Sequence, residues 1–432
     1  MKISKHALIH LFTVWLYILC IISTYLCGVY QNYSYLGFQL NENINFSVVL
    51  FISVFVSLLS IFLPVRIEKP SQLLLLFSYY FIYIPNTLMS YIGHNKGNEY
   101  WFYVFLYFTI CISLVFFISK LEINKKILVN VNIKNIEIKI LIFLVMLLIP
   151  VVYFYKPDFS NILRLTSLVD LYDWRDDYRE KTKNIPTLVE YMFNWSSKIF
   201  IPLILLFGLF KKNIAIIFLA LFLNLSLFVV SGHKSIFFAY FFILIFYFIF
   251  RKSNKAIYVV SPFMGMVFVS TLIFFIFNQS ILVDVFLRRM IQIPGMLAGF
   301  YYEYFSENGF AKYSYNILKG ITHTKYEDIP PYLIGQNYFR NDGVNANAGY
   351  LTSAYAEFGY VGGIFITLIV CGLYKVIDNI IDSAKNNKTF LLLIFLLPTW
   401  ALINSAFITV MITHGLLLSI IFMIFLKDKV VK

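Results

Sequence analysis

The sequence contains little charge. Only 13% of its 432 residues are Asp, Glu, Lys or Arg, about half the share of roughly 25% in an average soluble domain, while 60% are hydrophobic. Apolar runs of about 18 or more residues recur along the whole chain, which is the pattern of membrane-spanning helices. These features exclude a soluble enzyme, a secreted scaffold and a disordered chain, and they predict an integral membrane protein.

Cysteines and common catalytic motifs are also scarce. The four cysteines all lie inside apolar runs without metal-ligand spacing, so they predict buried thiols rather than disulfides. The chain has no Walker loop, no HExxH and no GxSxG motif. Its one Ser-x-x-Lys string, Ser231 to Lys234, lacks the companion motifs of a nucleophilic serine. We therefore expect neither a metal ion nor another cofactor.

Twelve apolar ranges predict an all-α polytopic membrane protein with a single integral membrane domain over residues 1–432. The first range continues too far for a signal peptide and lacks a small-residue cleavage site, which predicts an uncleaved first helix. Because backbone groups have no water partner in lipid, each range should be helical. The ranges are 8–29, 46–63, 72–92, 100–119, 139–155, 191–210, 213–230, 235–250, 256–278, 350–374, 390–406 and 409–426.

The net charge of +13 predicts the orientation of the chain. If both termini are cytoplasmic, the inner segments hold 20 of the 35 Lys and Arg but only six of the 22 Asp and Glu. The outer segments then hold the remaining 15 bases and 16 acids. This asymmetry obeys the positive-inside rule. We therefore expect both termini in the cytoplasm and no nucleic-acid partner.

Two external loops are expected to be much longer than the others, at about 156–190 and about 279–349. The second holds Arg288 and Arg289, whose planar guanidinium groups suit phosphate. This stretch also has apolar residues at helical spacing, namely Ile281, Leu282, Val285 and Phe286, which predict an amphipathic helix along the membrane interface. Pro294-Gly295 should end or bend that helix. Plain anchoring by snorkelling arginines is the alternative.

Other ionisable residues are candidates for function, each with a simpler alternative. Arg340 and His323 lie further along the second loop, and Lys234 begins an apolar range at its outer end, where an anchor is the alternative. The first loop holds three arginines, which a solvated, salt-bridged helix would also explain; they are Arg164, Arg175 and Arg179. Ionisable residues within apolar ranges are rare and often functional. The clear examples in this chain are Glu357, Lys198 and His414. His414 could also be a histidine that serves only in helix packing.

Three stretches resemble the Wzy-type polymerases of O-antigen and capsular repeat units, which are relatives of the O-antigen ligases. They are Gly232-His-Lys-Ser, where the family often has Gly-x-Arg-Ser; Arg288 followed by Gly299, like the family's Arg-x10-Gly; and the segment 345–363, like the family's re-entry after its large loop. The likeness covers about residues 150–425. The first loop departs from the pattern, because Arg164 is followed at that spacing by Arg175.

The resemblance implies a metal-independent glycosyltransferase in the bacterial inner membrane. It would move a growing glycan from its undecaprenyl-pyrophosphate carrier to a sugar hydroxyl of a new lipid-linked repeat unit, at the outer leaflet, to make O-antigen (lipopolysaccharide) or capsule. Basic side chains would bind the departing pyrophosphate, with Arg288, Arg289, Arg340 and Lys234 as candidates. The candidates for the proton acceptor are His323, Glu303 and Glu357.

Other expectations follow from the same resemblance. Tyr301, Tyr302 and Tyr304 would stack on sugar faces, although an interfacial aromatic belt explains them equally well. The expected partners are the lipid-linked oligosaccharide, the lipid bilayer and a protein that regulates chain length. The alternatives are a ligase-like glycan transferase and a flippase or other transporter of lipid-linked oligosaccharides. Even loops and two similar halves, which flippases usually show, are missing from this sequence.

Overall fold

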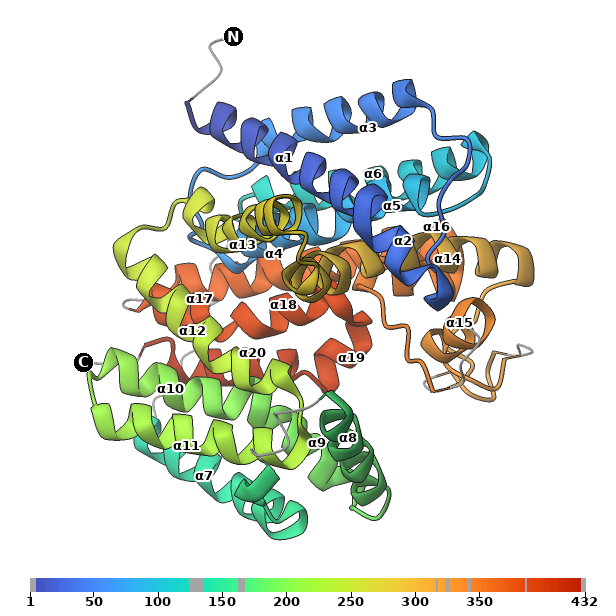
Figure 1. The fold of residues 1–432 in the computed structure, drawn as a ribbon. Helices are drawn as coiled ribbons and strands as arrows, with labels where there is room; N and C mark the ends of the chain where they lie inside the picture. The colour runs from blue at the N-terminus through green and yellow to red at the C-terminus, as the bar shows by residue number, and fades with distance from the viewer. Residues whose placement is uncertain are drawn as a thin grey trace.

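The computed structural model describes residues 5–123, 135–161, 168–315, 318–322, 326–339, 343–384 and 387–428. Within these ranges the chain is helical, and no β-strand is present (Figure 1). Ten helices are long and apolar enough to cross a membrane. The prediction of an all-α polytopic membrane protein is confirmed at this level.

The helices have the following bounds, with η marking π-helical and 3-10 segments. They are α1 (Lys5–Thr24), η1 (Tyr25–Val29), α2 (Tyr30–Tyr33), η2 (Ser34–Leu36), α3 (Phe46–Leu59), η3 (Ser60–Phe62), α4 (Pro70–Ser78), η4 (Tyr79–Tyr83), α5 (Ile84–Ile92), α6 (Asn98–Lys120), α7 (Ile136–Tyr155), α8 (Leu168–Lys183), α9 (Thr187–Trp195), η6 (Ser196–Phe200), α10 (Ile201–Phe210), α11 (Ile214–Ser231), α12 (Lys234–Lys252), α13 (Ala256–Phe277), η7 (Val283–Gln292), α14 (Ile293–Asn308), α15 (Pro330–Phe339), α16 (Tyr350–Asp382), α17 (Lys388–Ile394), α18 (Leu396–Asn404), α19 (Phe407–Ile412) and α20 (Leu416–Leu426).

The predicted apolar ranges and the observed helices agree closely. Ten of the twelve ranges coincide with the ten long apolar helices. The other two, 46–63 and 390–406, correspond to the shorter helical stretches Phe46–Phe62 and Lys388–Asn404. Three of the cysteines are buried as expected, but Cys27 is exposed, because its side chain lies on the outer face of η1.

The centre of the bundle is the continuous helix from α4 through η4 to α5, which is buried along its whole length. It contacts α6, α14, α16 and α18. By contrast, α7 and α11 lie at the periphery and expose large apolar side chains such as Ile149 and Phe218. An exposed apolar face of this kind suits a helix that is surrounded by lipid.

Three prolines inside helical runs each follow a π-helical segment. Pro85, Pro202 and Pro294 follow η4, η6 and η7, and an isoleucine precedes each of them. A proline lacks the N–H of the regular ladder and clashes with the carbonyl four residues earlier, and the wider π turn relieves that clash. In each case the isoleucine N–H bonds to the carbonyl five residues earlier, on Tyr79, Ser196 and Arg288.

The helix predicted at the start of the second long loop exists. Pro294-Gly295 does not end it, because the π turns of η7 carry the helix directly into α14. Of the four apolar residues that predicted an interfacial face, Ile281 and Val285 are exposed, while residues four apart point into the bundle because of the wider turn, namely Val283, Leu287 and Ile291.

Helix α14 folds back into the bundle and packs between α5 and α16. Gly295 packs on α5 and Gly299 packs on His94, just after the end of α5, because a Cβ at Gly295 would lie 2.6 Å from the Pro85 carbonyl oxygen and one at Gly299 would lie 2.2 Å from His94 Nε2. This is the small-xxx-small packing typical of membrane helices. Much of the expected external loop 279–349 is therefore part of the helical core.

The two ends of the bundle differ. The first helix begins and the last one ends at the same end, which also holds the α10–α11 and α12–α13 connections (left in Figure 1). Helices α8 and α15, from the two long loops, lie at the opposite end (right in Figure 1). We call the first the terminal end and the second the loop end.

Candidate functional site

The neighbouring arginines of η7 have different surroundings. Arg288 donates from Nε to Asp284 Oδ1 at 3.2 Å, and its guanidinium carbon lies 3.9 Å from the centre of the Tyr33 ring. Its side chain is only 11% exposed, so its charge is largely engaged within the protein. Arg289 is exposed, and the described part of the chain offers it neither a hydrogen bond nor an ion pair. Of the two, Arg289 is the more accessible to a ligand.

Glu303 lies on α14 at the loop end and is already paired. Its carboxylate is 2.8 Å from Lys96 Nζ, and Glu307 lies 3.8 Å from the same nitrogen. The hydrogen bond to Glu303 raises the pKa of Lys96, so the lysine remains charged. The Glu303 carboxylate is therefore engaged in an ion pair within the protein.

Glu357 lies near the start of α16, at a kink where Phe358 and Gly359 leave the helical conformation. Oε2 accepts a hydrogen bond of 2.6 Å from the Tyr313 N–H, and Oε1 accepts one of 2.5 Å from the Tyr315 hydroxyl. The main chain adds a third link, from the Lys312 N–H to the Glu357 carbonyl at 3.1 Å. Because both carboxylate oxygens are used, Glu357 anchors the segment after α14 to α16.

The other predicted residues do not join these two glutamates. Lys234 is exposed at the first position of α12, after the left-handed Gly232 that ends α11. His323 and Arg340 lie outside the described residues. Among the described residues that were predicted to bind the pyrophosphate or to accept the proton, no hydrogen bond or ion pair links one with another. Arg288 and Arg289 share only the helix η7.

Helix α8 brings part of the first long loop to the corner between α11 and α12. Arg175, Tyr178 and Arg179 lie on one stripe of α8, three and four residues apart. Arg175 Nε donates to the Gly232 carbonyl at 3.4 Å, and the Tyr178 ring meets the His233 ring at 5.6 Å in an edge-on arrangement. The Trp174 ring packs directly over Gly232, where a Cβ would lie 3.1 Å from it.

Lys198 and His414 meet beside this corner. The Lys198 ammonium contacts Nδ1 of His414 and lies 3.3 Å from Nε2. The Ser405 hydroxyl is 3.0 Å from the same Nε2. Lys198 belongs to the π-helical η6, while His414 lies in the break between α19 and α20, before the left-handed Gly415.

The break at His414 is built by its neighbours. Gly415 has φ +74°, and a Cβ there would lie 2.5 Å from the Ile199 side chain, so only glycine fits. The Trp195 indole N–H donates to the Ile412 carbonyl at 2.7 Å, which satisfies a backbone group that the break exposes. Irregular backbone within an apolar bundle is tolerated where protein groups satisfy it or where it lines a site.

We call Arg175, Arg179, Lys198, His233 and His414 the basic cluster. The charges of Arg175, Arg179 and Lys198 all act on His233, and Lys198 also contacts His414. In the described ranges, Lys198 has no ion pair with a carboxylate. The cluster thus gathers basic groups from four separate segments, and its lysine has no acidic partner among the described residues. This arrangement favours the binding of an anion.

The hydrogen-bond polarity argues against a catalytic serine at this place. An ammonium has only donors, so a protonated Lys198 makes His414 Nδ1 the acceptor and leaves the imidazole proton on Nε2. That proton is then donated to Ser405. A serine nucleophile needs the reverse, a histidine nitrogen that accepts the hydroxyl proton. When Lys198 is protonated, the chain from Lys198 through His414 to Ser405 can therefore donate to a negatively charged ligand.

Sequence reasoning identified the separate members of this cluster but not their proximity. Lys198 and His414 are noticeable in the sequence as rare ionisable residues within apolar runs, yet 216 positions separate them. Helix packing alone does not explain His414, because its ring contacts Lys198 and Ser405. His233 had no signal of its own beyond its place in Gly232-His-Lys-Ser.

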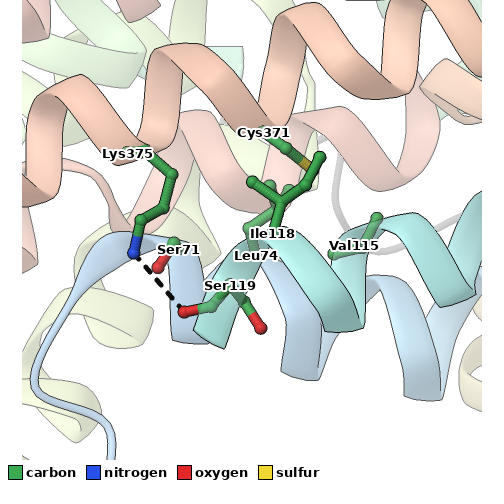
Figure 2. A pocket seen from close by; sticks show the side chains of 7 residues that line it. All are labelled: Ser71, Leu74, Val115, Ile118, Ser119, Cys371 and Lys375. Atoms are coloured by element: carbon green, nitrogen blue, oxygen red, sulfur yellow. Dashed lines mark hydrogen bonds between the residues drawn. The ribbon is translucent and has the colours of Figure 1, made fainter. Parts of the chain in front are cut away.

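A second polar network lies at the terminal end, between α4, α6 and α16. Figure 2 shows Lys375 reaching past Ser71 to the Ser119 carbonyl, at 3.4 Å, beside a gap too narrow for water. Lys375 also pairs with Asp378 at 3.3 Å, and Asp378 accepts hydrogen bonds from Ser71. Because its charges compensate each other internally, this network ties three helices together and leaves no charge for a ligand.

The fold and the site define a polytopic, all-α membrane protein with a basic cluster at its loop end. Within the described ranges, no group of three His, Cys, Asp or Glu side chains is placed to hold a metal ion. A scan against protein-family models, a search of curated proteins and a search of solved structures each find no match to this chain. The functional interpretation therefore rests on the cluster itself.

Proposed function

We propose that this protein polymerises lipid-linked glycan repeat units. It transfers a growing oligosaccharide from undecaprenyl pyrophosphate to a sugar hydroxyl of the next lipid-linked unit, at the outer leaflet of a bacterial inner membrane. The basic cluster is the observation that carries this proposal. A charge placed in an apolar helix costs about 2.5–3.5 kcal/mol even on lenient scales, so Lys198 would be retained there for a function.

The chemistry of the transfer matches these side chains. When the bond between the anomeric carbon and the pyrophosphate breaks, negative charge collects on the departing pyrophosphate. Fixed cations and N–H donors stabilise such charge strongly in a site with little water. Arg175, Arg179 and Lys198 supply the positive charge, and the chain through His414 to Ser405 supplies oriented donors.

The proposal includes a topology of twelve spans with both termini cytoplasmic. Charge asymmetry along the sequence supports it, as do the start of α1 and the end of α20 at the same end of the bundle (Figure 1). The shorter stretches Phe46–Phe62 and Lys388–Asn404 are the two additional spans. In this orientation the loop end, with the basic cluster, faces the outer side, where lipid-linked units are polymerised.

The residues predicted from sequence retain their roles as part of this proposal. Arg289 and Lys234 are the accessible candidates for further contacts to the pyrophosphate, and the same role is expected of Arg288 and Arg340. His323 remains a candidate proton acceptor. We expect no metal ion or other cofactor, and we expect a separate protein to regulate chain length.

Deleting the gene in its host tests this function. Loss of a polymerase should leave surface glycan that carries a single repeat unit, seen as the loss of the ladder of long chains on a gel. Long chains that remain on the lipid carrier would instead identify a ligase, and units trapped inside the cell would identify a flippase. Either of those results, or an unchanged ladder, would overturn the proposal.

Complementation then tests the basic cluster within the same strain. Lys198→Met keeps the length of the side chain but removes its charge, so we expect membrane accumulation without long chains. Lys252→Met is the matched control, because Lys252 is exposed at the terminal end of α12. A full ladder from Lys198→Met, equal to that from Lys252→Met, would show that the cluster does not bind the pyrophosphate.

A further inference from the structure

His233 is an accessible histidine within the basic cluster. It is the residue before α12, and its backbone N–H bonds to the Ser231 hydroxyl at 3.2 Å, which fixes the entry into the helix. The residue as a whole is exposed, although the Tyr178 ring covers one side of its imidazole. Within the part of the chain that the structure describes, neither ring nitrogen has a hydrogen-bond partner. Both nitrogens are thus available to a ligand.

The groups that face His233 come from three elements. Helix α8 contributes Arg175, Tyr178 and Arg179, η6 contributes Lys198, and α12 continues from His233 with Lys234. The pKa of His233 is lowered to about 4, mainly because burial among neighbouring residues disfavours the charged ring. The positive charges of Arg175, Arg179 and Lys198 lower it further. The imidazole is therefore neutral at physiological pH and can accept a proton.

Among the residues that the structure describes, the other possible proton acceptors are less suitable. Glu303 is held by Lys96, Glu357 uses both oxygens to anchor the segment after α14, and His414 Nδ1 is occupied by Lys198. We propose that His233 is the general base of the glycan transfer, and that it accepts the proton of the attacking sugar hydroxyl. This inference rests on the proposed function and adds a catalytic residue to it.

The step balances without another reactant. The acceptor oxygen forms a bond to the anomeric carbon of the donor while its proton passes to His233. The bond from that carbon to the pyrophosphate oxygen breaks, and its electron pair leaves with the pyrophosphate. Arg175, Arg179 and Lys198 stabilise the charge of the leaving group. His233 afterwards releases its proton to water or to the departing pyrophosphate.

The same cations make His233 respond to the substrate. Without a ligand, three positive charges oppose protonation of the imidazole. A bound pyrophosphate offsets these charges, so the affinity of His233 for a proton rises when the donor substrate is in place. A general base works best when its pKa lies near the working pH. Binding of the donor therefore converts a weak base into an effective one.

Proton uptake on ligand binding tests this inference without relying on activity. Inorganic pyrophosphate is titrated into the purified full-length protein by calorimetry near pH 6, in buffers with different ionisation enthalpies. Wild-type protein should take up more protons per pyrophosphate bound than His233→Gln does. His6→Gln, at the opposite end of the molecule, is the matched control and should behave as wild type. Equal proton uptake by wild type and His233→Gln would overturn the inference.

Elongation rates complete the test. With lipid-linked repeat units extracted from the host, His233→Gln should lower kcat by about 10²–10⁴-fold with little change in KM, as the loss of a general base does. An unchanged kcat, in a strain whose deletion does abolish long chains, would refute the role of His233 and leave the proposed function intact. A deletion without effect on chain length would refute the proposed function, while the proton-uptake result would still decide whether His233 titrates with the bound anion.

Discussion

Replacing Gly299 by alanine tests whether the second long loop is built into the helical core. Gly299 lies on α14 where that helix crosses α5, and a Cβ at this position would lie 2.2 Å from His94 Nε2. The His94 ring has no room to retreat, because it packs edge-on against Phe300 at 4.5 Å and its Nε2 is 3.0 Å from the Met296 carbonyl oxygen. The new methyl group must therefore push two helices apart or expel the imidazole.

The expected cost follows from three terms. Gly to Ala in a helix interior normally stabilises by about 1 kcal/mol. Overpacking a filled contact costs about 1–3 kcal/mol, and losing the hydrogen bond from His94 to Met296 costs about another 1 kcal/mol. The net effect is a destabilisation of roughly 1–3 kcal/mol, which in a protein of this size lowers the unfolding temperature by a few degrees.

Thermal unfolding of the detergent-purified protein measures this cost. Gly265→Ala and Gly372→Ala are matched controls, since both glycines lie inside helices and a Cβ at either would meet nothing within 4 Å. They should unfold at the wild-type temperature or slightly above it. The double variant Gly299→Ala with His94→Ala should recover part of the loss. If Gly299→Ala is as stable as the two controls, α14 does not pack on α5 as described.

Two further outcomes are expected. Glu357→Leu removes the acceptor of the Tyr313 and Tyr315 hydrogen bonds, so limited proteolysis should cut residues 309–315 faster, whereas Glu307→Gln, whose side chain is 64% exposed, should leave the cutting rate unchanged. Burial lowers the pKa of His94 to about 4 from its ordinary 6.5, so the unfolded chain alone gains that proton between these values. Stability should fall by up to about 3 kcal/mol as the pH drops from 6.5 to 4, and the unfolding temperature of His94→Gln should depend less on pH.

The fold class could be predicted from the sequence because hydrophobicity along a membrane protein is a strong, local signal. Each long helix needs only its own apolar residues to be recognised, and each of the ten overlaps one predicted range. The course of η7 and α14 could not be predicted in this way. Their path depends on a π turn before Pro294 and on a close crossing with α5, and both require a partner helix about 200 residues away in the sequence.

The candidate site was predictable only in part, for a related reason. Scarcity of charge in apolar runs singles out Lys198 and His414, but nothing local indicates that they touch. For the arginines of the first loop, alternating charge equally fits a solvated helix, and only the docking of α8 on Gly232 brings Arg175 beside His233. Glu303 and Glu357 looked equivalent in sequence, and their partners, Lys96 and Tyr315, distinguish them from free proton acceptors.

The three Ile-Pro pairs, each preceded by a π-helical turn, relate the irregular helix paths to the positions of the charged residues. A proline removes the N–H that the carbonyl four residues earlier would use, and an unsatisfied carbonyl is costly in an apolar environment. A π-helical turn before a proline is therefore expected where neighbouring helices cover its backbone. Lys198 lies in the π turn before Pro202, and Arg288 and Arg289 lie in the one before Pro294, so these three charged residues occur where the helix is already interrupted. Lys375 and Asp378, by contrast, lie in a regular part of α16 and compensate each other. Covering protein tolerates both an irregular backbone and a charge better than lipid does, and this common requirement explains how a lysine without an acidic partner in the described ranges, such as Lys198, can lie at a helix discontinuity inside the bundle.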